Sequence, residues 1–316
     1  MKPKVVVIVG PTASGKTALS IELAKRINGE IISSDSMQIY KDMDIGTAKV
    51  TKEEAQGIKH YLVDCISPDS RYTVSDFKKD SENAIEEILS KGKVPIVVGG
   101  TGLYVNSLIY GIEYQDMNFD EEYRNKLMND AENPEKLEEI WQQACKIDFK
   151  AMEKISKNDK KRIIRVLEIY KATGLTKTEQ EALSRAKELK YDFKVFGITI
   201  DREKLYEKIN RRVDIMIENG LEDEVRNLIS KYTEFPTAMQ GLGYKEVVEY
   251  FNGTLSYDEM IEKIKQESRR YAKRQLTWFR KNKETIWLDG EKTTKENVDI
   301  ILEELEWKKY RKVRIK

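Results

Sequence analysis

The feature that most constrains the fold is a glycine-rich segment near the start of the chain, Gly10-Pro11-Thr12-Ala13-Ser14-Gly15-Lys16-Thr17. It follows an apolar run at residues 5–9, typical of a buried strand, and precedes a helix-period stretch at 18–27. This order is that of a P-loop, whose backbone N–H groups surround a phosphate at a helix N-terminus. We expect Lys16 to contact the outer phosphate oxygen atoms and the Thr17 hydroxyl to ligate Mg²⁺. The loop alone leaves open whether the bound group is ATP or another diphosphate.

The rest of the chain predicts a two-part architecture. Further apolar runs predict strands at 31–32, 61–63, 94–98 and 196–200, with helix-period stretches between them. This alternation predicts an α/β fold, a P-loop NTPase-like core of three layers around a parallel sheet. Helical patterns at 121–128, 134–144 and 163–172, without a convincing strand, predict an all-helical insertion. We therefore predict a discontinuous core at 1–114 and 191–316 and an insertion domain at 115–190, with helices dominant after residue 202.

Composition excludes several classes of protein. His60 is the only histidine among 316 residues, so a histidine metal cluster or a Ser-His-Asp triad is nearly excluded. Cys65 and Cys145 lie far apart in the sequence and lack the close spacing of a zinc-ligand pair or a redox motif. We interpret both as structural thiols, which suits a reducing cytosol. No window approaches 18 uninterrupted apolar residues and no signal-peptide pattern is present, so we expect a cytoplasmic protein without a membrane partner.

The near-zero net charge of +1 conceals blocks of basic residues. Residues 150–165 contain 7 basic and 2 acidic side chains, residues 269–283 contain 7 basic and no acidic ones, and residues 307–316 contain 6 and none. A single basic run is often only a solvated helix face. Three runs together favour binding to nucleic acid.

Two polar residues follow other predicted strands. Asp35 comes after the strand at 31–32, and Thr101 follows the strand at 94–98, at the edge where open α/β sheets bind ligands. The second of these strands ends without the aspartate that binds Mg²⁺ in an ordinary ATPase, which counts against ATP hydrolysis. On the residues alone, a turn or N-cap role for Asp35 and Thr101 stays open.

Several motifs in the same order resemble those of the tRNA dimethylallyltransferases. Besides the P-loop they are Asp35-Ser36-Met37-Gln38-Ile39-Tyr40, Met43-Asp44-Ile45-Gly46-Thr47-Ala48-Lys49, Gly99-Gly100-Thr101-Gly102-Leu103-Tyr104, Asn210-Arg211-Arg212-Val213-Asp214, Gly220-Leu221, Met239-Gln240-Gly241-Leu242-Gly243-Tyr244-Lys245-Glu246 and residues 271–280. The resemblance spans nearly the whole chain, so it is far more specific than the P-loop alone.

This resemblance implies transfer of a dimethylallyl group from dimethylallyl diphosphate to N6 of the adenosine on the 3′ side of the anticodon, in tRNAs that read codons beginning with U. The P-loop would then hold a diphosphate leaving group, assisted by Mg²⁺ as cofactor. We expect Asp35 to accept the proton of the amine and Thr101 to hydrogen-bond the amine or the diphosphate. Arg212 would stabilise the diphosphate with Lys16. A surface ion pair of Arg212 stays open on the sequence alone.

The resemblance also implies contacts with the tRNA anticodon stem-loop, whose acceptor base must be flipped out of its stack. The expected contacts are Asp35, Ser36, Met37, Gln38 and Thr101 near the base, Arg124, Lys161, Arg162, Ile163, Ile164 and Arg165 in the insertion, and Arg274 and Arg280 near the C-terminus. Lys161 departs from the family, which usually has glutamine there. An ion pair of Arg124 with Asp120 or Glu121 stays open, as does a core role for Trp278 and Phe279. We expect a monomer.

Three other functions fit part of the sequence. A P-loop kinase of small molecules would leave the basic insertion unexplained. Prenylation of free AMP, ADP or ATP would not require a large RNA-binding insertion. A non-catalytic RNA-binding protein with a structural P-loop would bind tRNA without turnover.

Overall fold

The structure is a computed structural model in which residues 2–112, 120–185 and 188–306 are described. It divides into two compact units: a core unit of Met1–Val105 and Lys190–Lys316, and a helical unit of Asn106–Leu189. The predicted boundary between residues 114 and 115 and the basic tail at 307–316 lie outside the described residues.

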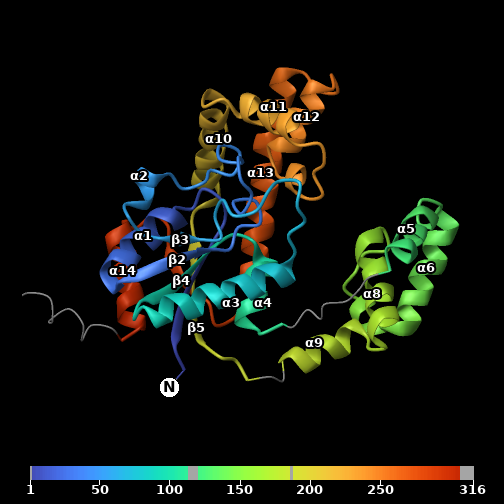
Figure 1. The fold of residues 1–316 in the computed structure, drawn as a ribbon, viewed down its shortest axis with the longest axis horizontal. Helices are drawn as coiled ribbons and strands as arrows, with labels where there is room; N and C mark the ends of the chain where they lie inside the picture. Colours follow the sequence, from blue (N-terminus) through green and yellow to red (C-terminus); the bar gives the residue numbers. More distant parts are fainter. Residues whose placement is uncertain (1, 113–119, 186–187, 307–316) are drawn as a thin grey trace, which may run out of the picture. The chain divides into compact units, whose positions relative to one another are not determined.

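Within the described residues, the core unit contains one parallel sheet of six strands in the order β3-β2-β4-β1-β5-β6 (Figure 1). The strands are β1 (Lys4–Val9), β2 (Gly29–Ser33), β3 (His60–Tyr61), β4 (Val94–Gly99), β5 (Asp192–Thr199) and β6 (Ile286–Asp289). Register pairs Ser33 with Val98 and Val9 with Gly99, so β1, β2 and β4 end at the same edge. The predicted α/β core with a parallel sheet is confirmed, although the strand β6 was not predicted.

Helices cover both faces of this sheet, which explains why β1 is apolar from residue 5 to residue 9. On one face, Val6 and Ile8 share an apolar cluster with residues of α1 (Lys16–Ile27) and α14 (Thr294–Glu304). On the other face, α3 (Val74–Ser90) packs against β2 and β4 (Figure 1). Helix, sheet and helix form the three layers that the sequence predicts.

The remaining helices of the core unit follow the strands β2, β4 and β5. They are α2 (Lys52–Ala55), the start of α4 (Gly102–Ile109), α10 (Arg202–Glu218), α11 (Leu221–Lys231), the 3₁₀ turn η1 (Ala238–Gln240), α12 (Tyr244–Phe251) and α13 (Tyr257–Phe279). Helix α10 packs along α13 through a cluster that includes Leu205, Ile209 and Ala272. This pairing brings α10 and α13 to the carboxyl edge of the sheet, beside the P-loop residue Ala13.

The helical unit has a core of its own. It contains the end of α4, α5 (Glu121–Asp130), α6 (Pro134–Ile147), α7 (Phe149–Met152), α8 (Lys160–Thr173) and α9 (Lys177–Arg185). Ile163, Val166 and Leu167 on one face of α8 pack with Leu127 of α5 and Ile140 of α6. The described residues of this unit form helices and no strand.

Among the described residues, no helix is both long and apolar enough to cross a lipid bilayer.

Candidate active site

The P-loop turns from the end of β1 into the start of α1, as the sequence predicts. The backbone N–H of Ser14 donates to Pro11 O at 3.3 Å, and Gly15 has a φ of 87°, a left-handed conformation that favours glycine. No side chain caps the N-terminus of α1, and its first turn contains no acidic residue. The N–H groups of this turn therefore remain for a ligand, and the helix dipole favours an anion there.

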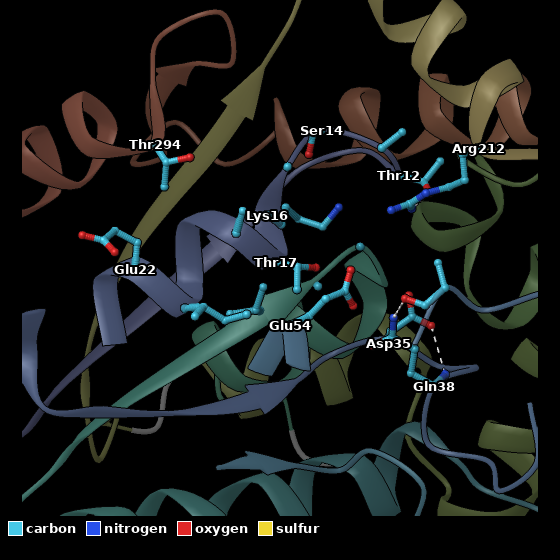
Figure 2. A pocket seen from close by; sticks show the side chains of 18 of the residues that line it. Thr12, Ser14, Lys16, Thr17, Glu22, Asp35, Gln38, Glu54, Arg212 and Thr294 are labelled. Carbon is cyan, nitrogen blue, oxygen red and sulfur yellow. Dashed lines mark hydrogen bonds between the residues drawn. The ribbon is translucent and has the colours of Figure 1, made fainter. Parts of the chain in front are cut away.

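Two cations lie beside this loop. Lys16 Nζ donates to Pro11 O at 2.6 Å, and Arg212 Nη1 donates from α10 to Thr12 Oγ1 at 3.1 Å. In Figure 2 the side chains of Lys16 and Arg212 point toward one another. Burial lowers the pKa of Lys16 to about 7, aided by the charge of Arg212 and opposed by Asp35. Burial lowers the pKa of Arg212 as well. A bound anion would compensate both desolvated charges. Arg212 is thus part of the loop's surroundings and not a surface ion-pair residue.

A cavity of about 640 Å³ opens in front of the loop, wholly within the core unit. Its volume lies in the range of about 300–1,000 Å³ that is usual for sites of small organic ligands. Besides the loop, its walls include Asp35, Gln38, Thr47, Ala48, Glu54, Gly99, Gly100, Arg212, Tyr271 and Gln275. Anion-binding groups and the carboxylates of Asp35 and Glu54 therefore face one common cavity.

Asp35 and Thr101 are neighbours, as predicted from their places after two strands. Strands β2 and β4 are paired, and Ser36 N donates to Thr101 Oγ1 at 3.0 Å. Asp35 Oδ1 accepts from Met37 N at 2.9 Å and from Gln38 N at 3.3 Å, so the carboxylate also forms the turn considered above. Both bonds use Oδ1, which leaves Oδ2, within the described structure, able to accept a proton from a ligand in the cavity.

A buried amide on α13 joins the P-loop to the Thr101 segment. Gln275 is 5% exposed; its Oε1 accepts from Thr12 N at 2.9 Å, and its Nε2 donates to Gly100 O at 3.0 Å. A Cβ on Gly100 would lie 2.0 Å from Gln275 Nε2, so the close approach requires glycine there. Gln275 was not among the site residues predicted from the sequence. Its spacing of four residues from Tyr271 was the available signal, because both then lie on one helix face.

Tyr271 adds a hydroxyl to the same wall. Its side chain lines the cavity together with that of Gln275. Burial, and to a lesser extent the negative charge of Asp35, raises the pKa of Tyr271 to about 12. The hydroxyl therefore stays protonated at neutral pH and is able to donate a hydrogen bond. Tyr271 is a further cavity residue that the sequence analysis did not select.

The other residues predicted near the base are held by the core unit itself. Gln38 Nε2 donates to Thr47 O at 3.2 Å and to Ala48 O at 3.3 Å, while Gln38 Oε1 accepts from Ser33 Oγ at 3.2 Å. The Ser36 hydroxyl accepts from Thr101 Oγ1 at 3.2 Å. The amide of Gln38 is thus fully engaged within the protein. Contact of Ser36, Met37 and Gln38 with tRNA remains a prediction.

The last turns of α13 contain both a core residue and exposed arginines, which are the two roles left open on the sequence alone. Phe279 is 4% exposed and belongs to the core, whereas Arg274 and Arg280 are exposed to solvent. The guanidinium of Arg274 lies 5.7 Å from the centre of the Tyr271 ring. The two arginines are available to a polyanion, and their contact with tRNA remains a prediction.

The predicted contact segment of the helical unit lies at the start of α8. Ile163 and Ile164 are 0% and 1% exposed because they fill the core of this unit, so their side chains are not available to RNA. The expectation of side-chain contacts from these two residues is therefore corrected. Lys161 and Arg162 are exposed, and Arg162 Nε lies 3.2 Å from Asp159 Oδ2.

A buried carboxylate organises the two other arginines of this segment. Glu168 is 3% exposed, and its Oε1 and Oε2 lie 3.6 Å from Arg124 Nε and 3.5 Å from Arg165 Nη1. Arg124 is thus paired with Glu168, and among the described residues it forms no ion pair with Asp120 or Glu121; Asp120 instead accepts from Lys171 at 2.7 Å. One carboxylate cannot neutralise two guanidinium groups, so the pair keeps a net positive charge.

The cavity also offers oxygen ligands for a divalent cation. Thr17 is exposed to it, and the carboxylates of Asp35 and Glu54 lie in its walls (Figure 2). Among the described residues, no group of three or more His, Cys, Asp or Glu side chains forms a complete metal cage. Hydroxyl and carboxylate oxygen atoms suit Mg²⁺, which is commonly held by few protein ligands together with substrate phosphates. These residues therefore fit the predicted ion, and its binding remains a prediction.

Comparisons with known proteins extend over most of the chain. The sequence model of the IPP transferase family matches residues 38–282, a match that begins after the P-loop and does not depend on it. A protein of Acetivibrio thermocellus described as a tRNA dimethylallyltransferase is 54% identical over 287 residues, covering 90% of this chain and 91% of that protein.

Two solved structures resemble the whole architecture. The full-length tRNA isopentenylpyrophosphate transferase from Bacillus halodurans has a TM-score of 0.72 and 42% identity, covering 98% of this chain and 99% of its own. A eukaryotic dimethylallyltransferase, described in crystallographic snapshots of its action on tRNA, has a TM-score of 0.77 and 30% identity, covering 99% of this chain and 81% of its own.

Proposed function

This chain belongs to the IPP transferase family of tRNA dimethylallyltransferases, and on that premise we propose how its cavity carries out the transfer. It is a prenyl-transferring enzyme that acts on tRNA. The donor is dimethylallyl diphosphate and the acceptor is N6 of the adenosine on the 3′ side of the anticodon. One observation carries this proposal: a P-loop with two desolvated cations shares a single cavity with the carboxylate of Asp35.

The loop end of the cavity binds the diphosphate. As the bond between C1 of the dimethylallyl group and the diphosphate oxygen breaks, the electron pair leaves with the diphosphate. Negative charge then develops beside Lys16, Arg212 and the first-turn N–H groups of α1. Preorganised positive groups stabilise such charge most strongly where water is excluded. The P-loop here serves a leaving group and not a phosphoryl transfer.

The strand-end side of the cavity binds the adenine. N6 of adenine is a poor nucleophile because its lone pair is delocalised into the ring. As N6 forms its bond to C1, the amine must lose a proton, and Asp35 Oδ2 accepts it. Thr101 and the protonated Tyr271 hydroxyl lie beside this carboxylate and orient the base and the diphosphate by hydrogen bonds.

Thr17, with Asp35 or Glu54 through water, would hold Mg²⁺ against the diphosphate. When bound, the ion would neutralise charge on the leaving group. The chain's own residues bind and orient the reactants and accept the proton. A tRNA substrate accords with a cytoplasmic enzyme, and we propose that it acts as a monomer.

A pH dependence of donor binding follows from the lowered pKa of Lys16. In the unliganded protein this pKa is about 7, and a bound diphosphate raises it by favouring the charged ammonium. At a pH below the pKa that Lys16 has in the unliganded protein, Lys16 is already protonated and takes up no proton when the donor binds. Above it, binding takes up a proton, so the contribution of Lys16 to donor affinity weakens as the pH rises.

Calorimetry in buffers of different ionisation enthalpy measures this proton uptake. At about pH 8 we expect donor binding to native protein to take up more protons than donor binding to Lys16→Arg, by nearly one proton per site. The reason is that arginine is charged before the donor binds, whereas most of Lys16 is not. The comparison with Lys16→Arg removes the titration of the diphosphate itself. Equal proton counts for the two proteins would mean that Lys16 does not titrate on binding.

A second prediction concerns the exposed cations at the start of α8. Replacing Lys161, Arg162 and Arg165 together by alanine should weaken tRNA binding and reduce its salt dependence, since each lost phosphate contact removes about 0.7–0.9 from the slope of log K against log salt. Filter binding at several salt concentrations measures this slope. The matched control replaces Lys136, Lys171 and Lys177, which form ion pairs on the helical unit outside the basic run 150–165. Equal slopes in native and triple-variant proteins would place the RNA surface elsewhere.

The function itself is tested by incubating the protein and Mg²⁺ with labelled dimethylallyl diphosphate and unmodified tRNA, with parallel reactions that contain AMP or ATP alone. We expect label in tRNA and none in AMP, without hydrolysis of ATP. Labelled AMP alone would identify a prenyltransferase of free nucleotides, and ATP hydrolysis alone would indicate a P-loop kinase or ATPase.

A further inference from the structure

Three motifs of the sequence have no role in the transfer described above. They are Met43-Asp44-Ile45-Gly46-Thr47-Ala48-Lys49, the Gly220-Leu221 step, and the segment from Met239 to Glu246. In the structure the first and the third of them bond one carboxylate, that of Glu224, and the Gly220-Leu221 step begins the helix α11 that carries it. None of the three motifs lies next to the P-loop in sequence.

Glu224 accepts four hydrogen bonds from two of these motifs. Its Oε2 accepts from Asp44 N at 2.8 Å and Ile45 N at 2.7 Å, and its Oε1 accepts from Gly46 N at 3.0 Å and from the Tyr244 hydroxyl at 2.6 Å. Successive backbone N–H groups that converge on one anion form a nest, and bonds to an ionised acceptor are stronger than neutral ones. The carboxylate therefore fixes the backbone of residues 44–46.

The surroundings of this carboxylate make the anchorage specific. Tyr244 is 1% exposed, and a Cβ on Gly46 would lie 2.6 Å from its ring, so the loop packs directly on the tyrosine. Lys49 holds the far side of the loop, since its Nζ donates to Tyr40 O at 2.9 Å and to Asp64 Oδ1 at 3.0 Å. Residues 44–49 are thus fastened at both ends.

The anchored loop continues directly into the wall of the active cavity. Thr47 and Ala48 line it, and their carbonyl groups accept the two bonds from Gln38 Nε2. The backbone N–H of Gln38 in turn donates to Asp35 Oδ1. A continuous set of hydrogen bonds therefore runs from Glu224 through the loop and Gln38 to the carboxylate that accepts the proton.

We propose that Glu224 is a positioning residue for the acceptor side of the cavity: it holds residues 44–48, and through Gln38 it sets the place of Asp35 relative to the adenine. The inference rests on the proposed function. Glu224 lines a separate surface hollow and not the active cavity, so it acts through the loop without touching substrate. The P-loop, Lys16 and Arg212 are not part of this set of bonds.

The test compares Glu224→Gln with Asp223→Asn. Both changes remove one negative charge from the first turn of α11, so they share any effect of the helix dipole, but only Glu224 bonds the loop. In Glu224→Gln the side-chain NH₂ replaces one of the two carboxylate oxygen atoms, so donors of the loop or of Tyr244 then face another donor. We expect Glu224→Gln to lower kcat with tRNA by about 10- to 100-fold, the size of effect that a small misplacement produces. The Kd for dimethylallyl diphosphate should change by less than about twofold, and Asp223→Asn should resemble native protein.

Hydrogen exchange of the backbone N–H groups provides a readout that does not depend on activity. In Glu224→Gln, exchange at Asp44, Ile45 and Gly46 should accelerate while β1 and β4 keep native protection. A native kcat, or unchanged exchange at these three residues, would overturn the proposal. Exchange that accelerates throughout the sheet, with donor affinity lost in parallel, would also overturn it by making Glu224 a residue of general stability. If native protein transferred nothing to tRNA, the proposed function would fail, and the local exchange would still decide the anchorage.

Discussion

Asp35→Asn is expected to lower the rate of dimethylallyl transfer to tRNA by about 10²- to 10⁴-fold, as the loss of a general base does. The structure makes asparagine the informative change. Asp35 Oδ1 accepts from Met37 N and Gln38 N, and the amide oxygen of asparagine preserves both bonds and hence the turn. What is lost is the negative charge and the second oxygen atom that receives the proton from N6.

Single-turnover kinetics with donor and enzyme in excess over tRNA measure this step directly. Asp35→Ala, which also removes the turn, should be at least as slow as Asp35→Asn. The affinity of Asp35→Asn for tRNA should stay near the native value, since the base leaves binding surfaces elsewhere intact. A native single-turnover rate in Asp35→Asn would remove this residue from its role as base.

Lys16→Ala is expected to lower kcat by about 10²- to 10³-fold, the size of loss seen when one group that stabilises developing charge is removed. Lys16 belongs to the P-loop end of the cavity, and its desolvated ammonium lies beside Arg212, with Pro11 O as its hydrogen-bond partner. Without it, Arg212 is the remaining cationic side chain beside the P-loop that stabilises the leaving diphosphate. Donor affinity should weaken as well, because the ground-state diphosphate is also charged.

Lys25→Ala is the matched control for this change. Lys25 lies on the same helix and lines the same cavity, but it is exposed and bonds to Gln56. Steady-state kinetics with varied donor should give Lys25→Ala values close to native. Equal losses in the two variants would indicate a general effect of positive charge and would contradict a specific role for Lys16.

Local patterns predicted the diphosphate end of the site because its residues are contiguous. The P-loop is a single run of eight residues between a strand and a helix. Its residues can therefore be recognised without knowing how the strands pair in the sheet. Asp35 and Thr101 were also found, because the carboxyl ends of parallel strands share one edge whatever the strand order. The position of Arg212 in the cavity came from the family resemblance and not from spacing.

Long-range contacts explain most of what the sequence did not reveal. Gln275 bonds a backbone group 263 residues away, and Glu224 bonds three backbone groups 178 to 180 residues away. Such bonds leave no local pattern, since backbone N–H and C=O groups are the same in every residue. The strand β6 has only four residues and depends on pairing with β5.

The error at Ile163 and Ile164 has a different cause. Both were grouped with the basic residues around them. Ile163 lies three and four residues before the buried Val166 and Leu167, and Ile164 lies three and four residues before the buried Leu167 and Glu168. This spacing is typical of the buried face of a helix. Helical periodicity, applied within the basic run, separates the exposed Lys161 and Arg162 from the core residues.

The measurement that tests the central claim most directly is nucleoside mass spectrometry of tRNA after incubation with the protein, dimethylallyl diphosphate and Mg²⁺. Two transcripts are compared, one with adenosine on the 3′ side of the anticodon and one with inosine, which keeps a purine ring but lacks the exocyclic amine. We predict N6-dimethylallyladenosine from the first transcript and no prenylated nucleoside from the second. A prenylated inosine, or a prenylated nucleoside elsewhere in both transcripts, would contradict the claim that this cavity joins a diphosphate-bound dimethylallyl group to N6 of that adenosine.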